Sequence, residues 1–287
     1  MNILPEPIVN FACHTGEAPL WHPDEGVVYW VDIPRAKLYR HAPDTGKTDT
    51  FDTGAPVGAF TIHEDGRLLL FMAEGAVRLW HEGEMETVLD GLPEEKGNRF
   101  NDVIADPEGR VFCGVMSTPD RAGRLYRFDP DRRVTVIQND TGTANGMGFS
   151  PDLKTLYFCD SGQCRMYAYD YDRATGGITN RRVVVEPGPD EGKTDGMTVD
   201  TAGNLWSARW DGSRLVHHAP DGRVLQTIPF PVKKVSCVTF GGPDYTDMYI
   251  TTAGGQDPAE NGELAGALFH LNLGIQGKPE FRSKLNS

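Results

Sequence analysis

The chain has 287 residues, of which 39% are hydrophobic and 24% charged, and its formal net charge is −13. This composition is typical of a folded globular protein rather than a disordered one, and the negative charge argues against nucleic acid or an anionic membrane as the main partner. Residues 1–7 contain neither the basic region nor the apolar region of a signal peptide, and no apolar run approaches the roughly 20 residues of a membrane span, so we expect a cytoplasmic protein.

Six segments of the chain repeat one pattern, in which an apolar run is followed by a turn rich in Asp, Pro and Gly and then by a second apolar run. Aligned on the turn, the segments place six residues in register, 41 to 50 residues apart: Glu17, Gly58, Asn101, Asn145, Asp195 and Ser236. Propeller blades repeat every ~40–50 residues. The spacing therefore predicts one blade per segment.

Each repeat is rich in β-branched and aromatic residues, and none contains an apolar pattern of helical period long enough for a helix. Second strands are expected at 27–31, 68–71 and 155–158, and third strands at 37–40, 123–128 and 165–169. A single sheet of this kind cannot bury both faces, whereas six stacked around an axis can. We therefore predict an all-β, six-bladed β-propeller in which residues 1–287 form one domain, and a linear solenoid is the alternative.

The two ends of the chain are expected to share a blade. The last repeat ends near residues 267–271, and the apolar stretch Pro7–Phe11 is predicted to add a strand to it. This pairing would remove an exposed sheet edge and close the ring.

The register also predicts a central metal site. The innermost strand of each blade lines the channel of a propeller, so the six aligned positions converge on its axis, and four of them carry a carboxylate or an amide. Oxygen donors without His or Cys suit Ca²⁺, Mg²⁺ or Mn²⁺, with Zn²⁺ or Fe²⁺ also possible. For single pairs such as Asn145-Gly146, the alternative is that the side chain stabilises a turn.

Four stretches resemble the gluconolactonase/regucalcin (senescence marker protein 30) family. They are GEAPLWHPDEGVVYWVDI (16–33), RFNDVIADPEGRVFCGVM (99–116), NGMGFSPDLKTLYFCDS (145–161) and DGMTVDTAGNLWSARW (195–210). The resemblance covers nearly the whole chain. It implies a six-bladed propeller with one catalytic divalent cation that opens sugar lactones.

The resemblance also implies roles for individual residues. Glu17, Asn145 and Asp195 would be the metal ligands, Arg99 and Asn101 would hold the substrate, and Asp102 would lie near the metal or its waters and help to bind substrate. Some family members place an acidic residue that contacts sugar after the third-blade GxM motif. Here Met116 is followed by Ser117-Thr118-Pro119, so the lactone itself is not predicted.

The chemistry of lactone opening assigns catalytic roles to the two carboxylates, Glu17 and Asp195. A divalent cation would polarise the carbonyl and activate water, and Asp195 is the candidate general base or water-orienting group. Arg99 would stabilise the developing oxyanion or hold substrate hydroxyls. The alternative for Arg99 is an ion pair with Glu94 or Glu95.

Two other functions remain open on the same site. One is hydrolysis of organophosphates, because a cation that polarises C=O also polarises P=O. The other is a non-enzymatic, calcium-binding or protein-interaction propeller. The preferred metal and the oligomeric state are not predicted.

Two further expectations concern Cys and His. The odd number of cysteines, five without a C-x-x-C pattern, favours reduced and mostly buried thiols. His217 and His218 fall in a third-strand region and are expected to be exposed on one side.

Overall fold

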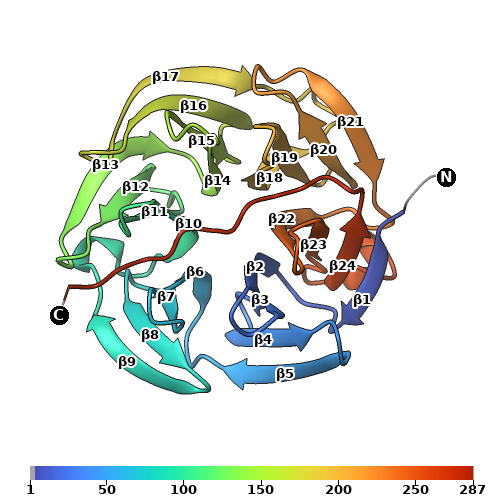
Figure 1. Ribbon diagram of the computed structural model, residues 1–287, viewed down its shortest axis with the longest axis horizontal. Coiled ribbons are helices and arrows are strands. Elements are labelled where there is room, and N and C mark those ends of the chain that lie inside the picture. The colour runs from blue at the N-terminus through green and yellow to red at the C-terminus, as the bar shows by residue number, and fades with distance from the viewer. Residues whose placement is uncertain (1–3, 287) are drawn as a thin grey trace.

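The computed structural model describes residues 4–286, which form six four-stranded antiparallel sheets arranged as blades around a central axis (Figure 1). The predicted six-bladed β-propeller is therefore confirmed. The first three blades are β2 (Gly16–His22), β3 (Val27–Asp32), β4 (Lys37–Ala42) and β5 (Lys47–Asp52); β6 (Val57–Ile62), β7 (Leu68–Met72), β8 (Val77–His81) and β9 (Glu84–Leu89); and β10 (Phe100–Ala105), β11 (Val111–Val115), β12 (Gly123–Phe128) and β13 (Val134–Thr141).

The other three blades complete the ring. They are β14 (Ala144–Phe149), β15 (Thr155–Asp160), β16 (Arg165–Asp172) and β17 (Gly177–Val185); β18 (Lys193–Val199), β19 (Leu205–Trp210), β20 (Arg214–His218) and β21 (Val224–Pro229); and β22 (Val235–Gly241), β23 (Asp247–Thr252) and β24 (Ala267–Asn272) with β1 (Glu6–Asn10). Two single-turn helices, η1 (Pro93–Glu95) and α1 (Pro258–Asn261), lie in connecting segments. Within residues 4–286, no helix is long and apolar enough to cross a membrane.

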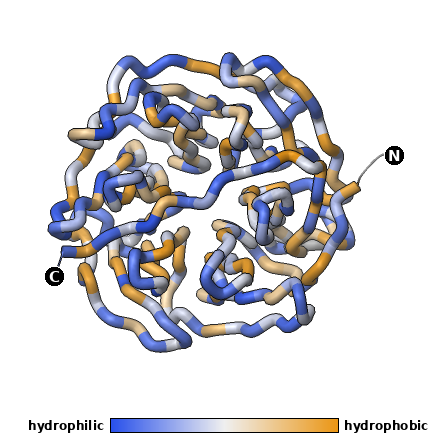
Figure 2. Tube along the Cα trace, in the orientation of Figure 1, coloured by the Kyte–Doolittle hydropathy of each residue, from blue (hydrophilic) through white to orange (hydrophobic). Residues whose placement is uncertain are grey.

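The burial of the strands decreases from the axis of the ring to its rim. Every residue of the inner strands β2, β6, β14 and β22 is buried, because each lies between neighbouring blades, whereas most residues of the outer strand β21 are exposed. Hydrophobic and hydrophilic stretches accordingly alternate within every blade rather than gathering in one region (Figure 2). The apolar core is thus divided among the interfaces between blades.

Glycine allows the inner strands to approach one another closely. A Cβ at Gly58 would collide with the carbonyl oxygen of Phe100 in the third blade, and one at Gly146 would collide with the backbone of Met197 in the fifth. Gly58 is also the one aligned position without a functional side chain. At this level of the channel the second blade therefore has no polar group, and the absence of a side chain lets its inner strand lie close to that of the third blade.

The two ends of the chain close the ring in the sixth blade. Strand β1 pairs antiparallel with β24, and Glu6 lies opposite His270. The predicted N-terminal strand is therefore confirmed, and it covers the outer edge of the last blade.

Residues 273–286, which we term the C-terminal strap, cross the face of the ring (Figure 1). The strap was not predicted. It bonds to all six blades: Arg282 to Asp24, Ser283 N–H to Ile62 O, Lys284 N–H to Gly109 O, Lys278 Nζ to Phe149 O, Thr201 N–H to Gln276 O and Gly277 N–H to Tyr245 O. The turns that it contacts all lie at the end of the channel opposite the starts of the inner strands.

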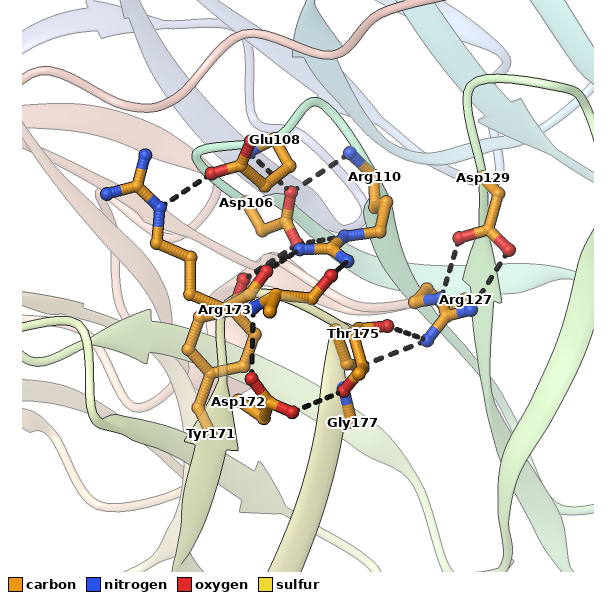
Figure 3. A network of polar contacts seen from close by, with 12 residues as sticks. Asp106, Glu108, Arg110, Arg127, Asp129, Tyr171, Asp172, Arg173, Thr175 and Gly177 are labelled. Carbon is orange, nitrogen blue, oxygen red and sulfur yellow. Dashed lines mark hydrogen bonds and ion pairs between the residues drawn. The ribbon is translucent and has the colours of Figure 1, made fainter.

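A polar network on the same face joins the third and fourth blades (Figure 3). The buried Asp106 carboxylate accepts hydrogen bonds from Arg110 Nε at 2.6 Å and from the Tyr171 hydroxyl at 2.8 Å. Arg110 in turn donates to the carbonyl of Arg173. Asp106 also accepts from the backbone N–H groups of Glu108 and Arg110, so one side chain organises a turn and a blade interface together.

The Cys and His expectations have different outcomes. All five cysteines are free thiols, and only Cys164 is partly exposed. The expectation for His217 and His218 is wrong, because both are buried. His217 stacks on Trp206 with ring centroids 4.0 Å apart, and His218 lies 2.9 Å from Arg209 Nη2.

Candidate active site

A cavity of about 200 Å³, the central cavity, lies at the end of the channel where the inner strands begin. It is open to solvent on the face opposite the strap. Four blades line it, with Thr15, Glu17 and Ile33 from the first, Arg99, Asn101 and Met116 from the third, Thr143, Asn145, Ser161 and Gly162 from the fourth, and Lys193, Asp195 and Trp210 from the fifth.

The structure brings the three predicted metal ligands, Glu17, Asn145 and Asp195, together in this cavity, and all three are buried. Asn145 Nδ2 donates to Ser161 Oγ at 2.9 Å and to Asp195 Oδ1. The amide oxygen of Asn145 is therefore turned away from its protein partners. Asn145 Oδ1 and Asp195 Oδ2 are buried and have no hydrogen-bond partner within residues 4–286.

Unpaired buried oxygens are costly unless something binds to them. Two carboxylates and an amide oxygen are donors that a hard divalent cation prefers. No three His, Cys, Asp or Glu side chains gather at one point in the described part of the chain. The Asn145 oxygen is thus needed as the third protein donor, and the residues present fit a cation.

The electrostatics of the cavity favour a positive ligand. Burial raises the pKa of Glu17 to about 8, and the negative charge of Asp102 adds to the shift. Burial also raises the pKa of Asp195, and the charge of Glu17 contributes next. Two buried carboxylates that repel each other would bind either protons or a cation.

Arg99 is held against the cavity wall by its neighbours. Its Nη1 donates to Phe100 O at 2.9 Å and to Asn101 Oδ1 at 2.6 Å. Asn101 Nδ2 donates to Ala144 O in the next blade at 2.7 Å. Both ends of the Asn101 amide are therefore engaged in fixing Arg99 and the blade interface.

The alternative ion pair of Arg99 is not formed. Glu95 instead binds Arg121, at 2.8 Å from Oε1 to Nη1, and accepts hydrogen bonds from the Tyr126 hydroxyl and Asn98 Nδ2. Burial lowers the pKa of Arg99, and the charges of Glu17 and Asp195 oppose that shift. The guanidinium thus faces the two carboxylates rather than the surface.

Asp102 does not line the central cavity, although the sequence assigned it to substrate binding. Its side chain lines a smaller cavity of about 50 Å³ deeper in the channel, together with Glu280 of the strap. Asp102 lies in the irregular part of β10 between Phe100 and Val103, and its side chain lines this cavity whereas that of Asn101 lines the central one. Burial raises the pKa of Asp102 to about 6, and its influence on the site is electrostatic.

Ser236, the sixth aligned residue, has a structural contact instead of a place in the cavity. Its Oγ donates to the carbonyl of Gly16 at 2.6 Å and so joins the sixth blade to the first. The converging polar set is therefore Glu17, Asn101, Asn145 and Asp195.

Ser161 and Trp210 were missed because the aligned positions lie only on inner strands. Ser161 follows the second strand of its blade, and Trp210 ends the second strand of the fifth blade. Lys193 begins the inner strand β18, two residues before the aligned Asp195. In an antiparallel blade, the end of the second strand lies beside the start of the first. That geometry was available from the sequence and would have placed Ser161 and Trp210 at the site.

Comparisons with known proteins agree with this architecture. Residues 15–254 match the family described as SMP-30/Gluconolactonase/LRE-like region. The chain is 43% identical to the pentonolactonase XacC of Haloferax volcanii over 96% of this chain and 97% of that protein, and 35% identical to the regucalcin of Xenopus laevis over 95% of each. The solved structure of a calcium-binding protein, regucalcin, from Agrobacterium tumefaciens superimposes with a TM-score of 0.92 at 25% identity, covering 99% of this chain and 98% of that one.

Proposed function

We propose that this chain, which belongs to the SMP-30/gluconolactonase/LRE family, hydrolyses the ester ring of sugar lactones. The observation that carries the proposal is the meeting of Glu17, Asn145 and Asp195 around unpaired oxygens in one cavity, beside the half-buried guanidinium of Arg99. The relative that is 43% identical over nearly the whole chain is named a pentonolactonase.

Glu17, Asn145 Oδ1 and Asp195 Oδ2 would hold one divalent cation. When bound, the cation would polarise the lactone carbonyl and make a nearby water more acidic. Oxygen donors are compatible with Ca²⁺, Mg²⁺, Mn²⁺, Zn²⁺ and Fe²⁺, so the donor set leaves the choice of ion to experiment.

Substrate binding and proton transfer fall to the protein side chains. Arg99 donates the N–H groups not used by Phe100 and Asn101 to oxygens of the lactone, where negative charge develops as the ring opens. Asn101 positions that guanidinium. Asp195, whose Oδ1 accepts from Asn145 and whose Oδ2 would hold the cation, is placed to orient the attacking water more than to remove its proton, because a neighbouring cation lowers the pKa of a carboxylate.

The experiment removes metal from the purified protein and follows acid release from a panel of aldonolactones while each of the five ions is added back singly. We expect hydrolysis to return with at least one ion and to be lost in Glu17→Ala and Asp195→Ala. Asp221→Asn is the matched control, because this carboxylate lies exposed on a turn of the same blade and accepts only from Arg223 N–H. Circular dichroism checks that each variant is folded.

Other outcomes separate the competing functions. Turnover of a fluorophosphate but no lactone would establish a phosphotriesterase instead. Tight metal binding without turnover of either substrate would reject the enzyme and favour a calcium-binding propeller.

A further inference from the structure

A second cavity, which we term the side groove, adjoins the central cavity at the fifth blade. Its volume is about 480 Å³, and the connection between β17 and β18 forms one wall, with Cys164 and Asp211 opposite. Lys193 and Trp210 line both cavities. The two spaces are therefore neighbouring compartments that share a boundary of two side chains.

The sizes of the compartments suggest that they act together. Pockets for small molecules usually measure about 300–1,000 Å³. The central cavity alone, at about 200 Å³, falls below that range, whereas the two compartments together lie within it. A lactone ring would occupy the central cavity, and any substituent that points toward the fifth blade would enter the side groove.

The walls of the side groove are held in place by the chain itself. Gly188 N–H donates to Glu191 Oε2 at 2.7 Å, and Glu191 N–H donates to Gly188 O at 3.1 Å. Gly192 has a φ of +74°, and a Cβ there would lie 2.5 Å from the backbone nitrogen of Gly212. The connection is thus packed directly against the β19–β20 turn, and the groove does not need a ligand to form it.

The boundary residues have the chemistry of a sugar-binding surface. Trp210 is half-buried, and the Lys234 ammonium fixes it from 4.8 Å above the ring centroid. Lys193 lies directly opposite Trp210 across the β18–β19 pair and makes no ion pair with any residue in 4–286. An aromatic face beside a free donor suits a hydroxylated ring, which has apolar C–H groups on its faces and hydroxyls at its edge.

The charges around the side groove are mixed and do not form a phosphate site. Asp190 and Asp211 both line the groove. The nearby Arg214 is already engaged, because its Nε donates to Gly212 O at 2.8 Å and its Nη2 to Asp190 O at 3.4 Å. A phosphate would thus meet the Lys193 ammonium beside two carboxylates, of which Asp211 is already paired with Lys233 and Lys234.

From this arrangement we infer that the natural substrate is a lactone that carries a second sugar residue, with the lactone ring in the central cavity and the second sugar in the side groove against Trp210 and Lys193. This inference rests on the proposed lactonase function. It adds a subsite and names the class of substrate, the aldobionolactones.

The first experiment compares xylono-1,5-lactone with its 4-O-xylosyl derivative, and glucono-1,5-lactone with cellobiono-1,5-lactone, after subtraction of spontaneous hydrolysis. We expect the KM of each disaccharide lactone to be about 5- to 20-fold lower than that of its parent, as expected for one aromatic contact and one charge-assisted hydrogen bond. Equal or higher KM values would overturn the subsite while leaving the lactonase intact. Turnover of none of the four would instead reject the proposed function, and a preference for 6-phosphogluconolactone would show that the groove binds phosphate.

The second experiment fills the groove in the folded protein. Cys164 lines it and is the partly exposed thiol, whereas the other four cysteines are buried. We expect one benzyl methanethiosulfonate adduct, verified by mass spectrometry, to reduce turnover of the disaccharide lactones at least about tenfold more than that of the parent lactones. Dithiothreitol should restore turnover of the disaccharide lactones. In Cys164→Ser, the reagent should not change the ratio of disaccharide-lactone turnover to parent-lactone turnover. Equal inhibition of both substrate classes would contradict the inference.

A substitution provides an independent measure that does not depend on labelling. Lys193→Gln should raise the KM of the disaccharide lactones about 5- to 10-fold more than that of the parents. Lys154→Gln is the matched control, since this exposed lysine of the fourth blade does not line either cavity. Equal effects of Lys193→Gln on both substrate classes would remove Lys193 from the subsite.

Discussion

At one end of the channel, Asn145 Oδ1 and Asp195 Oδ2 are buried without a partner, and two carboxylates repel each other. At the other end, the C-terminal strap bonds to turns of all six blades, and Asp106 accepts four hydrogen bonds in one network. The two ends of the channel therefore have different roles. The strapped end stabilises the ring, and the open end can therefore keep the unfavourable groups that binding and catalysis need.

The largest effect is expected at the open end. Asp195→Asn should lower kcat/KM for a lactone by about 10³-fold or more, because a carboxylate that binds and orients reactants is lost. The same change should raise the Tm of the metal-free protein, since it removes one of two buried like charges. Steady-state kinetics and calorimetry test both parts together, and a lower Tm would show that Asp195 supports the fold as well.

At the strapped end, Asp106→Ala should lower the free energy of unfolding by about 3–4 kcal/mol, because buried Arg110 loses its carboxylate partner. KM for the lactone should not change. Urea denaturation measures the loss. Asp172→Ala is the control within the same network, and we expect less than about 1 kcal/mol, since this exposed carboxylate accepts only from Ala174 N–H and Thr175 Oγ1 in its own turn.

The strap itself should contribute less per side chain. Phe281 packs against Phe149 with ring centroids 6.2 Å apart and contacts the apolar clusters between the second and third blades and between the third and fourth blades. Phe281→Ala should cost about 2–3 kcal/mol of unfolding free energy, and the exposed Lys284→Ala less than about 0.5 kcal/mol. A large change in kcat for Phe281→Ala would show that the two ends are coupled rather than separate.

The smallest effect concerns pH. Between the ordinary pKa of Glu17, 4.5, and its folded value of about 8, the folded protein retains a proton that the unfolded chain has released, so metal-free stability falls as the pH rises through this range. A cation competes with that proton. The increase in Tm produced by saturating Ca²⁺ or Mn²⁺ should therefore be a few degrees greater at about pH 8.5 than at about pH 6. An equal increase at both values would exclude proton competition at Glu17.

Repetition made much of this molecule predictable. Six copies of one pattern predicted the blades, and the same register predicted that Glu17, Asn145 and Asp195 would meet, because equivalent positions in a ring converge on its axis. The pairing of the N-terminal strand followed from the need to cover an edge.

Features without a repeat could not be predicted in this way. The strap has no equivalent elsewhere in the chain, and its apolar anchor Phe281 stands alone between polar residues. Asp102 follows Asn101 directly, yet the two side chains line different cavities, which the aligned positions alone do not show. His217 is polar in sequence but buried in the fold, where Trp206 stacks on it and Asp200 Oδ2 lies 3.4 Å from its Nε2.

The closure of the ring by β1 has a consequence for synthesis on the ribosome. Glu6 is synthesised well before His270, which it lies opposite, so β1 has no native partner until the sixth blade follows. At about 5–20 residues per second, translation would leave that edge strand waiting for roughly 15 to 50 seconds. The exposed residues of β1, with a charged Glu6 and a proline at position 7, suit a strand that must stay unpaired for so long.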